Sequence, residues 1–145
     1  MTQTLHKAAL SVSHAPPPEA FAAIFAALDG FNTAWAGPAN PQPLAVLLHG
    51  PDGREVVGGL WGHSMYRWFS IQMLYVPPAL RETGNGTALV RAAEDTARAR
   101  GCLGAQVDTF SFQARGFYER LGYRVFATLP DLPPGHACHY LARRF

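Results

Sequence analysis

The stretch 81–86, which reads Arg-Glu-Thr-Gly-Asn-Gly, contains residue types that bind an anion through the backbone. It lies between the apolar run 71–76 and a helical pattern over 87–100. A glycine-rich turn before a helix lets consecutive backbone N–H groups point at one anion, and the helix N-terminus adds partial positive charge. The guanidinium of Arg81 can add a fixed cation beside these groups. The sequence therefore predicts a pyrophosphate site at this turn.

Two well-known phosphate-binding turns are excluded by residue identity. A P-loop requires Gly-Lys followed by Ser or Thr, whereas Gly86 is followed directly by Thr87. A dinucleotide-binding fingerprint requires a third glycine at the position of Leu89. What remains is the pattern Arg-x-x-Gly-x-Gly.

This pattern resembles the acyl-coenzyme A signature of the GNAT superfamily of N-acetyltransferases. A second segment, 111–123, reads Ser-Phe-Gln-Ala-Arg-Gly-Phe-Tyr-Glu-Arg-Leu-Gly-Tyr. It resembles the second motif of the family, Asn-x-x-Ala-x-x-Phe-Tyr-x-x-x-Gly-Phe/Tyr. The two motifs stand in the order that the family has, and the resemblance runs from about Trp61 to the C-terminus. It implies that acetyl-CoA is the acyl donor.

The resemblance also implies roles for individual residues. Tyr118 falls where many GNAT enzymes place a phenol beside the coenzyme A sulfur, as a general acid; alternatively, Phe117 and Tyr118 only anchor a short helix to the sheet. Backbone N–H groups at the end of the strand before the turn are implied to bind the acetyl group and pantetheine, because that strand splays from the next one in the family. The implied cofactor-binding residues are Leu74, Tyr75, Val76, Arg81, Glu82, Thr83, Gly84, Asn85, Gly86, Thr87 and Ser111.

Three of these residues depart from the family pattern. Ser111 stands where the family usually has asparagine, so its hydroxyl would partly replace the amide. Glu82 stands where glycine or a basic residue is frequent, and we expect it to face outward because a carboxylate repels a pyrophosphate. Asn85 replaces an aliphatic residue and is compatible with a left-handed or nest conformation.

The motifs do not assign a general base. The strand before the turn has no carboxylate, although many GNAT enzymes carry a glutamate there. Asp108, His63 and His136 are candidates, each with a structural role as the alternative, and water is a fourth. No metal site is expected.

Our first hypothesis is an N-acetyltransferase that moves the acetyl group from acetyl-CoA directly to a primary amine of a small molecule, within a ternary complex. Five aromatic residues form either an apolar wall for that amine or ordinary core: Trp35, Trp61, Tyr66, Trp68 and Tyr75. One alternative is a non-catalytic acyl-CoA-binding or sensor domain, motivated by Ser111, Glu82 and the missing carboxylate. The other is an acetyltransferase for protein N-termini or lysines.

Size and composition limit the remaining classes. A chain of 145 residues is expected to form one domain, 1–145. No apolar run approaches the ~20 residues that span a bilayer, and we expect a cytoplasmic protein without a signal peptide. The net charge of +2 comes from scattered arginines, so nucleic acid is not an expected partner. Cys102 and Cys138 are expected to be reduced thiols.

The elements that would position these residues follow from apolar periodicity and turn residues. We expect strands at 5–12, 44–49, 55–64, 66–76, 103–110, 123–129 and 137–144, and helices at 16–30, 87–100 and 113–121. The region 32–43 is expected to be a loop or a short helix. This order predicts an α+β fold, a GNAT-like three-layer α/β/α arrangement around a mixed, mostly antiparallel sheet.

Three packing expectations accompany this fold. In the first helix, Phe21, Ile24, Phe25 and Leu28 form a core-facing stripe, and Gly30 caps the helix. In the second helix, an inner stripe is expected at Ala88, Leu89, Ala92, Ala93 and Thr96, and Glu94 and Arg98 are expected to form an outward i,i+4 pair. A homodimer is expected through the edge of the 137–144 strand.

Overall fold

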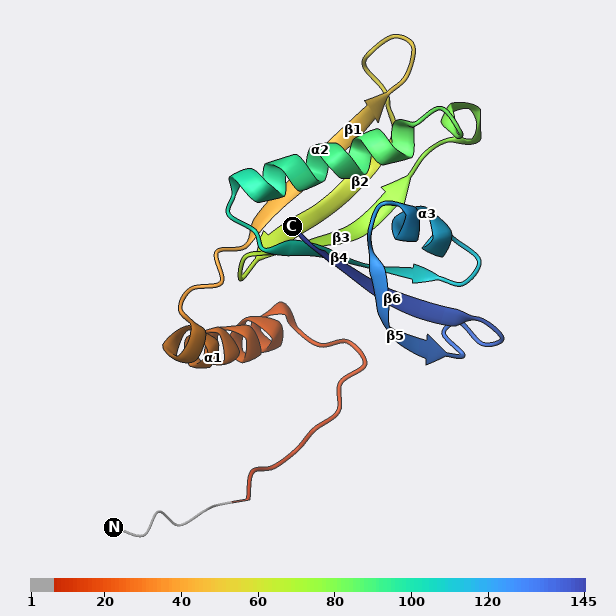
Figure 1. Cartoon of the computed structure of the whole chain (residues 1–145). Helices are drawn as coiled ribbons and strands as arrows, with labels where there is room; N and C mark the ends of the chain where they lie inside the picture. Colours follow the sequence, from red (N-terminus) through yellow and green to blue (C-terminus); the bar gives the residue numbers. More distant parts are fainter. Residues whose placement is uncertain (1–6) are drawn as a thin grey trace. The chain divides into compact units, whose positions relative to one another are not determined.

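The computed structural model describes residues 7–145 and contains one long helix followed by a six-stranded sheet with two further helices (Figure 1). The chain forms two separate units, of which the first ends at Pro38 and the second runs from Ala39 to Phe145. The elements are α1 (Pro18–Ala36), β1 (Gln42–His49), β2 (Val56–Met65), β3 (Trp68–Tyr75), η1 (Pro78–Leu80), α2 (Asn85–Ala99), β4 (Gly104–Phe110), α3 (Arg115–Arg120), β5 (Arg124–Pro130) and β6 (Ala137–Arg144).

The N-terminal unit differs from the sequence-based expectation in two ways. Residues 7–13 form no strand, and the first two residues of the expected strand lie outside the described part. A strand needs a neighbour to satisfy its backbone, and none is present within this unit. The helix also continues past Gly30 and ends at Gly37, whose φ is 75° and whose N–H donates to the carbonyl of Thr33 at 2.9 Å. A glycine inside a helix costs only about 1 kcal/mol, so Gly30 does not end it.

The apolar stripe of α1 is exposed within its own unit, so the core-facing role expected for it stays a prediction. The exposed fractions are 73% for Phe21, 70% for Ile24, 56% for Phe25 and 56% for Leu28. The longer helix extends the stripe with Phe31 and Trp35, which are 64% and 81% exposed. No helix of the described residues is both long and apolar enough to cross a membrane.

The sheet of the second unit has the strand order β1-β2-β3-β4-β6-β5. Strands β1, β2 and β3 form an antiparallel meander, β3 and β4 are parallel, and β6 is antiparallel to both β4 and β5. The predicted mixed, mostly antiparallel sheet of an α+β fold is therefore confirmed. The expected dimer edge is wrong, because β6 has a neighbour on each side and the two edges are β1 and β5.

Strands β3 and β4 separate halfway along their length. They pair only from Trp68 opposite Gly104 to Ile71 opposite Val107, although both strands continue for several residues. On the other side of β3, the pairing with β2 skips Gln72, as in a β-bulge. A bulge bends and twists its strand, which accounts for the divergence. The resulting opening positions the candidate site.

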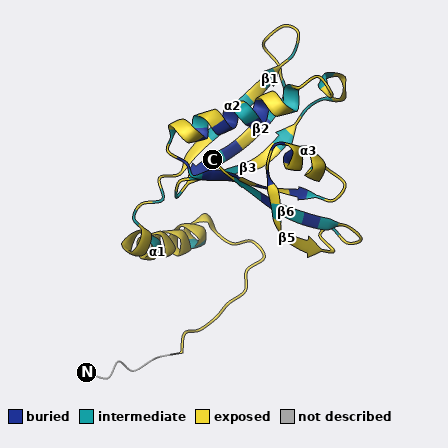
Figure 2. Ribbon diagram, viewed as in Figure 1, coloured by how far each residue is buried: buried dark blue, intermediate teal, exposed yellow. Residues whose placement is uncertain are grey.

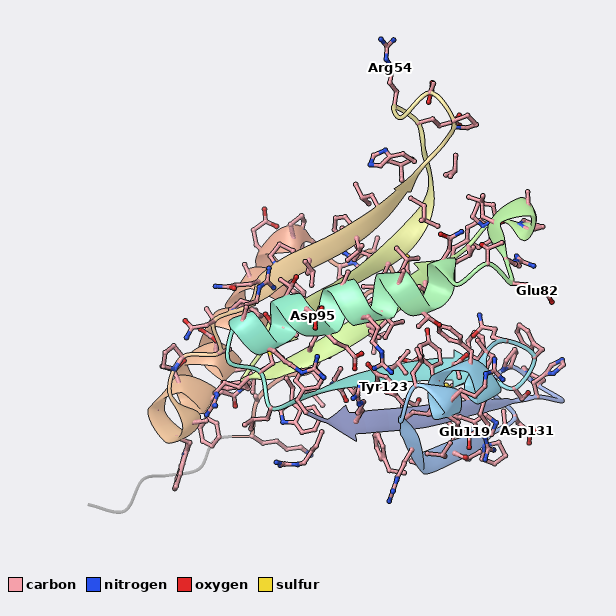
Figure 3. All side chains as sticks on the ribbon, turned by 45° about the horizontal axis from the view of Figure 1, so that its top comes forward. Arg54, Glu82, Asp95, Glu119, Tyr123 and Asp131 are labelled. Carbon is pink, nitrogen blue, oxygen red and sulfur yellow. The ribbon has the colours of Figure 1, made fainter. Side chains whose placement is uncertain are left out.

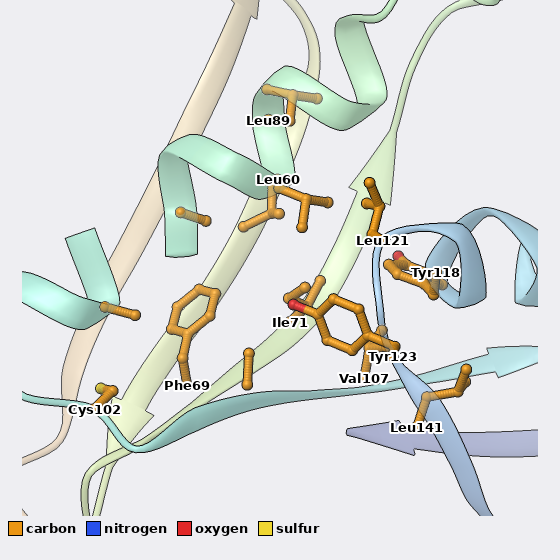
Figure 4. Packing of buried hydrophobic residues seen from close by; sticks show 14 residues of the cluster. Leu60, Phe69, Ile71, Leu89, Cys102, Val107, Tyr118, Leu121, Tyr123 and Leu141 are labelled. Carbon is orange, nitrogen blue, oxygen red and sulfur yellow. The ribbon is translucent and has the colours of Figure 1, made fainter. Parts of the chain in front are cut away.

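The core lies between the sheet and the two helices of the second unit (Figures 2 and 4). The fully buried members include Phe69, Val90, Ala93 and Leu141, each with 0% exposure. On α2 the buried residues are Leu89, Val90, Ala93, Glu94 and Ala97, so the inner stripe is rotated by about one residue from the expected one.

Glu94 therefore faces inward, and the predicted outward Glu94–Arg98 pair is wrong. Its carboxylate accepts from Arg143 at 2.6 Å, from Arg91 at 2.7 Å and from the Tyr123 hydroxyl at 3.4 Å. Arg98 pairs instead with Asp95 at 3.2 Å. A buried carboxylate is tolerated only with such partners, and here they connect α2 to β6 and to the start of β5.

Candidate active site

A cavity of about 920 Å³ opens where β3 and β4 separate. Residues from both strands, the turn before α2 and the region of α3 form its walls. They are Ile71, Gln72, Met73, Leu74, Tyr75, Val76, Arg81, Glu82, Gly84, Gly86, Thr87, Val107, Asp108, Thr109, Phe112, Gln113, Ala114, Phe117, Tyr118 and Arg120. Residues of both sequence motifs therefore line the same cavity.

The cavity reaches both faces of the sheet. Successive side chains of a strand point to opposite faces. On β4, Val107 and Thr109 are buried toward the core, whereas Asp108 between them is exposed, and all three line the cavity. A ligand on the α2 side and a second ligand on the opposite side can thus approach each other between the two strands.

The turn before α2 presents a row of free donors. Within the described structure, no backbone N–H from Glu82 to Thr87 donates to a protein acceptor, and the first bonded one is that of Ala88, to Gly84. Glu82 and Gly84 have φ values of 59° and 84°, in the left-handed region. Alternation of left-handed and ordinary residues produces an anion-binding nest, to which the N-terminus of α2 adds its dipole.

Polar side chains hold this turn in shape. The Thr83 hydroxyl donates to the carbonyl of Leu80 at 2.9 Å, and the Asn85 amide donates to the same carbonyl at 3.0 Å and to the Thr83 hydroxyl oxygen at 2.9 Å. Neither Thr83 nor Asn85 lines the cavity. Asn85 is the first residue of α2 and has no positive φ, so its expected left-handed conformation falls instead on Glu82 and Gly84.

The side chains of Arg81 and Glu82 take different directions from the turn before α2. The Arg81 Nε donates to the carbonyl of Val76 at 2.9 Å, and its guanidinium lies 5.9 Å from the centre of the Tyr75 ring. These contacts fix a positive charge at the cavity wall. The Glu82 side chain is exposed and projects from the tip of the turn (Figure 3).

Gly86 brings the two motifs into contact. A Cβ atom on Gly86 would lie 3.2 Å from two ring carbons of Phe117, which is closer than ordinary packing allows. The absence of a side chain therefore lets the N-terminus of α2 approach α3.

Tyr118 is buried on α3 and borders the cavity. Its ring is 4% exposed and packs edge-on against Phe117 at 5.1 Å and Tyr123 at 5.8 Å between centroids. Burial, and secondarily the negative charge of Asp108, raises the pKa of Tyr118 to about 12. The hydroxyl has no protein hydrogen bond in the described part, yet no buried side-chain polar atom there lacks a partner, so it retains access to the cavity. Figure 4 shows Tyr118 extending from α3 toward β3.

Of the three base candidates, Asp108 alone lines the cavity. His63 lies on β2, and the His136 ring packs edge-on against Phe112 at 4.9 Å. Ser111 does not line the cavity either. Its hydroxyl accepts from the N–H of Ala137 at 3.1 Å and so holds the start of β6.

Sequence reasoning missed several wall residues. Gln72 lines the cavity because of the bulge, which depends on pairing with β2 and has no local signal. Gln113 accepts from the Phe110 N–H at 2.8 Å and from the Thr109 hydroxyl at 3.2 Å, and it lies in the second motif. Of the aromatic residues expected around the acceptor, Tyr75 lines the cavity, and Trp35, Trp61, Tyr66 and Trp68 do not.

Comparison with known proteins identifies acetyltransferases. The model of the acetyltransferase (GNAT) family matches residues 10–123. The blasticidin-S acetyltransferase of Streptomyces morookaense is 46% identical over 90 residues, which cover 61% of this chain and 66% of that enzyme, slightly less than two thirds of its length.

Two solved structures are also similar. An acetyltransferase from Agrobacterium tumefaciens superposes with a TM-score of 0.86 at 35% identity, covering 95% of this chain and 100% of the other. A streptothricin acetyltransferase from Bacillus anthracis, in complex with acetyl coenzyme A, has a TM-score of 0.59 at 20% identity, covering 73% and 63%, and so shares the fold.

Proposed function

Because the chain belongs to the GNAT family of acetyltransferases, we propose that it transfers an acetyl group to a primary amine of a small molecule. The protein is an acyltransferase, and its donor is acetyl-CoA. The observation that carries the proposal is the cavity that crosses the sheet between β3 and β4, with an anion-binding turn at one side and a carboxylate at the other. The name of one relative, a blasticidin-S acetyltransferase that is 46% identical over 90 residues, supports a small acceptor.

In this proposal the donor lies on the α2 side of the cavity. Its pyrophosphate accepts from the free N–H groups between Glu82 and Thr87, and Arg81 balances its charge. Beyond Ile71, the edge of β3 that faces β4 has no strand partner. Its backbone groups near Leu74–Val76 are therefore free to bind the pantetheine amides and the acetyl carbonyl.

The acetyl group passes directly to the amine in a ternary complex. The neutral amine attacks the thioester carbon, the C–N bond forms, and the C–S bond breaks as the tetrahedral intermediate collapses. The Tyr118 hydroxyl, which is protonated at neutral pH, donates its proton to the departing thiolate. The proton lost by the amine goes to water or to Asp108, the base candidate at the cavity wall.

We also propose that the protein is a homodimer, on a ground different from the strand edge. Within its own unit, α1 leaves six large apolar side chains 56–81% exposed, and such a stripe requires a partner surface because it is costly to leave in water. A second copy of the chain would cover it. Light scattering should show a dimer, and Phe31→Glu should shift it toward the monomer; a wild-type monomer at micromolar concentration would refute this. The unpaired thiols support a cytoplasmic location.

Isothermal titration with acetyl-CoA, followed by a free-thiol assay across a panel of small amines and peptides, tests the proposed function. We expect binding and thiol release that depends on a small amine. Binding without release would favour a non-catalytic acyl-CoA sensor. Release only with peptides would favour a protein acetyltransferase, and no binding would contradict the assigned donor site.

A further inference from the structure

The charged residues of the cavity wall are unevenly distributed. The four are Arg81, Glu82, Asp108 and Arg120. Arg81 and Glu82 belong to the turn before α2, and Arg120 ends α3, so these three lie with the elements that pack on the core face. Asp108 is the one whose side chain leaves β4 toward the opposite face, where the acceptor would enter.

The carboxylate of Asp108 has little compensation from the protein. It takes part in no ion pair among residues 7–145, in which the four salt bridges use other carboxylates. Among the described residues, its carboxylate accepts a hydrogen bond from the Cys138 thiol, with Sγ 4.0 Å from Oδ2, and a thiol is a weak donor. The residue opposite it on β6 is Tyr140, which carries no positive charge. Asp108 thus presents to the cavity an exposed carboxylate that no cation among the described residues neutralises.

The reaction itself does not supply a cation to match this charge. The attacking nitrogen must be neutral with a free lone pair, so a simple monoamine brings no positive charge into the reactive complex. An acceptor with one further ammonium or guanidinium group retains one positive charge, which one carboxylate can bind through charge-assisted hydrogen bonds. A polyamine with several retained charges would find no other carboxylate on this side among the wall residues.

We infer that Asp108 is a specificity-determining residue that binds a second cationic group of the acceptor, so that the preferred substrates are small amines carrying one additional ammonium or guanidinium. This inference rests on the proposed acetyl transfer and defines the substrate class of the same site.

The test compares straight-chain ω-guanidinoalkylamines of increasing length with alkylamines of matched length. The measured quantity is the ratio of kcat/KM for the cationic acceptor to that for the neutral-tailed one, in wild type, Asp108→Asn and Asp95→Asn. Asp95 is an exposed aspartate on α2 outside the cavity and controls for the chemical change. We expect the ratio to fall on the order of 10- to 100-fold in Asp108→Asn and to stay unchanged in Asp95→Asn. An equal fall for both acceptors would overturn the inference and assign Asp108 to proton transfer.

A binding measurement separates this inference from the proposed reaction. Titration of the guanidinoalkylamines and alkylamines into the coenzyme A complex gives their affinity ratio without turnover. A cation preference that Asp108→Asn removes supports the inference even if no amine releases thiol, an outcome that would contradict the reaction alone. Equal affinities, or no detectable binding of either class, would overturn the inference. Acetyl-CoA affinity of Asp108→Asn should match wild type, which shows that the variant is folded.

Discussion

Replacement of Tyr118 by phenylalanine removes the hydroxyl of the proposed acid and keeps the packing of the ring. The ring of Tyr118 is 4% exposed and packs on Phe117 and Tyr123, and a phenylalanine ring can keep those contacts. The hydroxyl has no protein hydrogen-bond partner in the described structure, so its removal leaves no buried group unpaired. The expected change in the free energy of unfolding at neutral pH is therefore within about 1 kcal/mol.

The catalytic effect should be much larger. Loss of a positioned general acid lowers a rate by about 10²- to 10⁴-fold, which corresponds to roughly 2.7–5.4 kcal/mol of activation free energy. Acetyl-CoA binding depends mainly on the turn at 81–87 and should change little. Tyr118→Phe is thus expected to lower kcat at least about 100-fold with a nearly unchanged Kd for acetyl-CoA.

Steady-state thiol release gives kcat, isothermal titration gives the Kd of acetyl-CoA, and urea unfolding confirms the fold. Tyr66→Phe, which removes a phenol outside the cavity, is the matched control. Equal losses in kcat and acetyl-CoA affinity would indicate that Tyr118 only shapes the pocket. An unchanged kcat would refute the acid role.

Four further predictions concern the donor site, the hydrogen bonds of Glu94 and the pKa of Tyr118. Gly86→Val places a side chain against Phe117, so acetyl-CoA affinity should fall by about tenfold or more in titrations, whereas Gly30→Ala, at an open position, should not change it. Glu94→Ala leaves the partly buried guanidinium of Arg143 and the buried Tyr123 hydroxyl without their carboxylate and should cost about 3 kcal/mol in urea unfolding; a loss below ~1 kcal/mol would contradict the network around Glu94. Glu82→Gln removes a negative charge beside the pyrophosphate site and should tighten acetyl-CoA binding a few-fold, with the gain shrinking as salt rises. The pKa of Tyr118 is raised from 10 to about 12 on folding, so its contribution to the free energy of unfolding, roughly 3 kcal/mol, is complete below pH 10 and is lost as pH rises through about 12; Tyr118→Phe should flatten that part of the pH–stability profile measured by urea unfolding, and an unchanged slope would contradict it.

The sequence predicted best what local patterns encode. Alternating apolar residues and turn residues located the strands of the second unit within one or two residues, and two motifs located the turn at 81–86 and Tyr118. The first strand failed because a strand depends on a neighbour that local sequence does not name. Glu94 was misplaced because a charged residue was assumed to face water, whereas Arg91, Arg143 and Tyr123 come from separate segments.

A part of the site could be predicted only where all the residues that form it lie in one segment of the sequence. The free N–H groups follow from the glycines of the turn, but the separation of β3 and β4 depends on a bulge opposite β2. Ser111 follows the motif spacing, yet its hydroxyl is used by Ala137, which is 26 residues away. Such assignments require the tertiary arrangement.

The three side-chain hydrogen bonds around the Leu80 carbonyl bear on the kinetics of donor binding. Fixing the backbone of one residue costs about 1–2 kcal/mol in conformational entropy, so a mobile six-residue turn would have to recover roughly 6–12 kcal/mol when the donor arrives. Thr83 and Asn85 hold the turn in place in the free protein, and that cost is met when the chain folds. Donor association therefore needs no ordering step, and its rate should rise linearly with acetyl-CoA concentration instead of reaching a plateau set by loop closure.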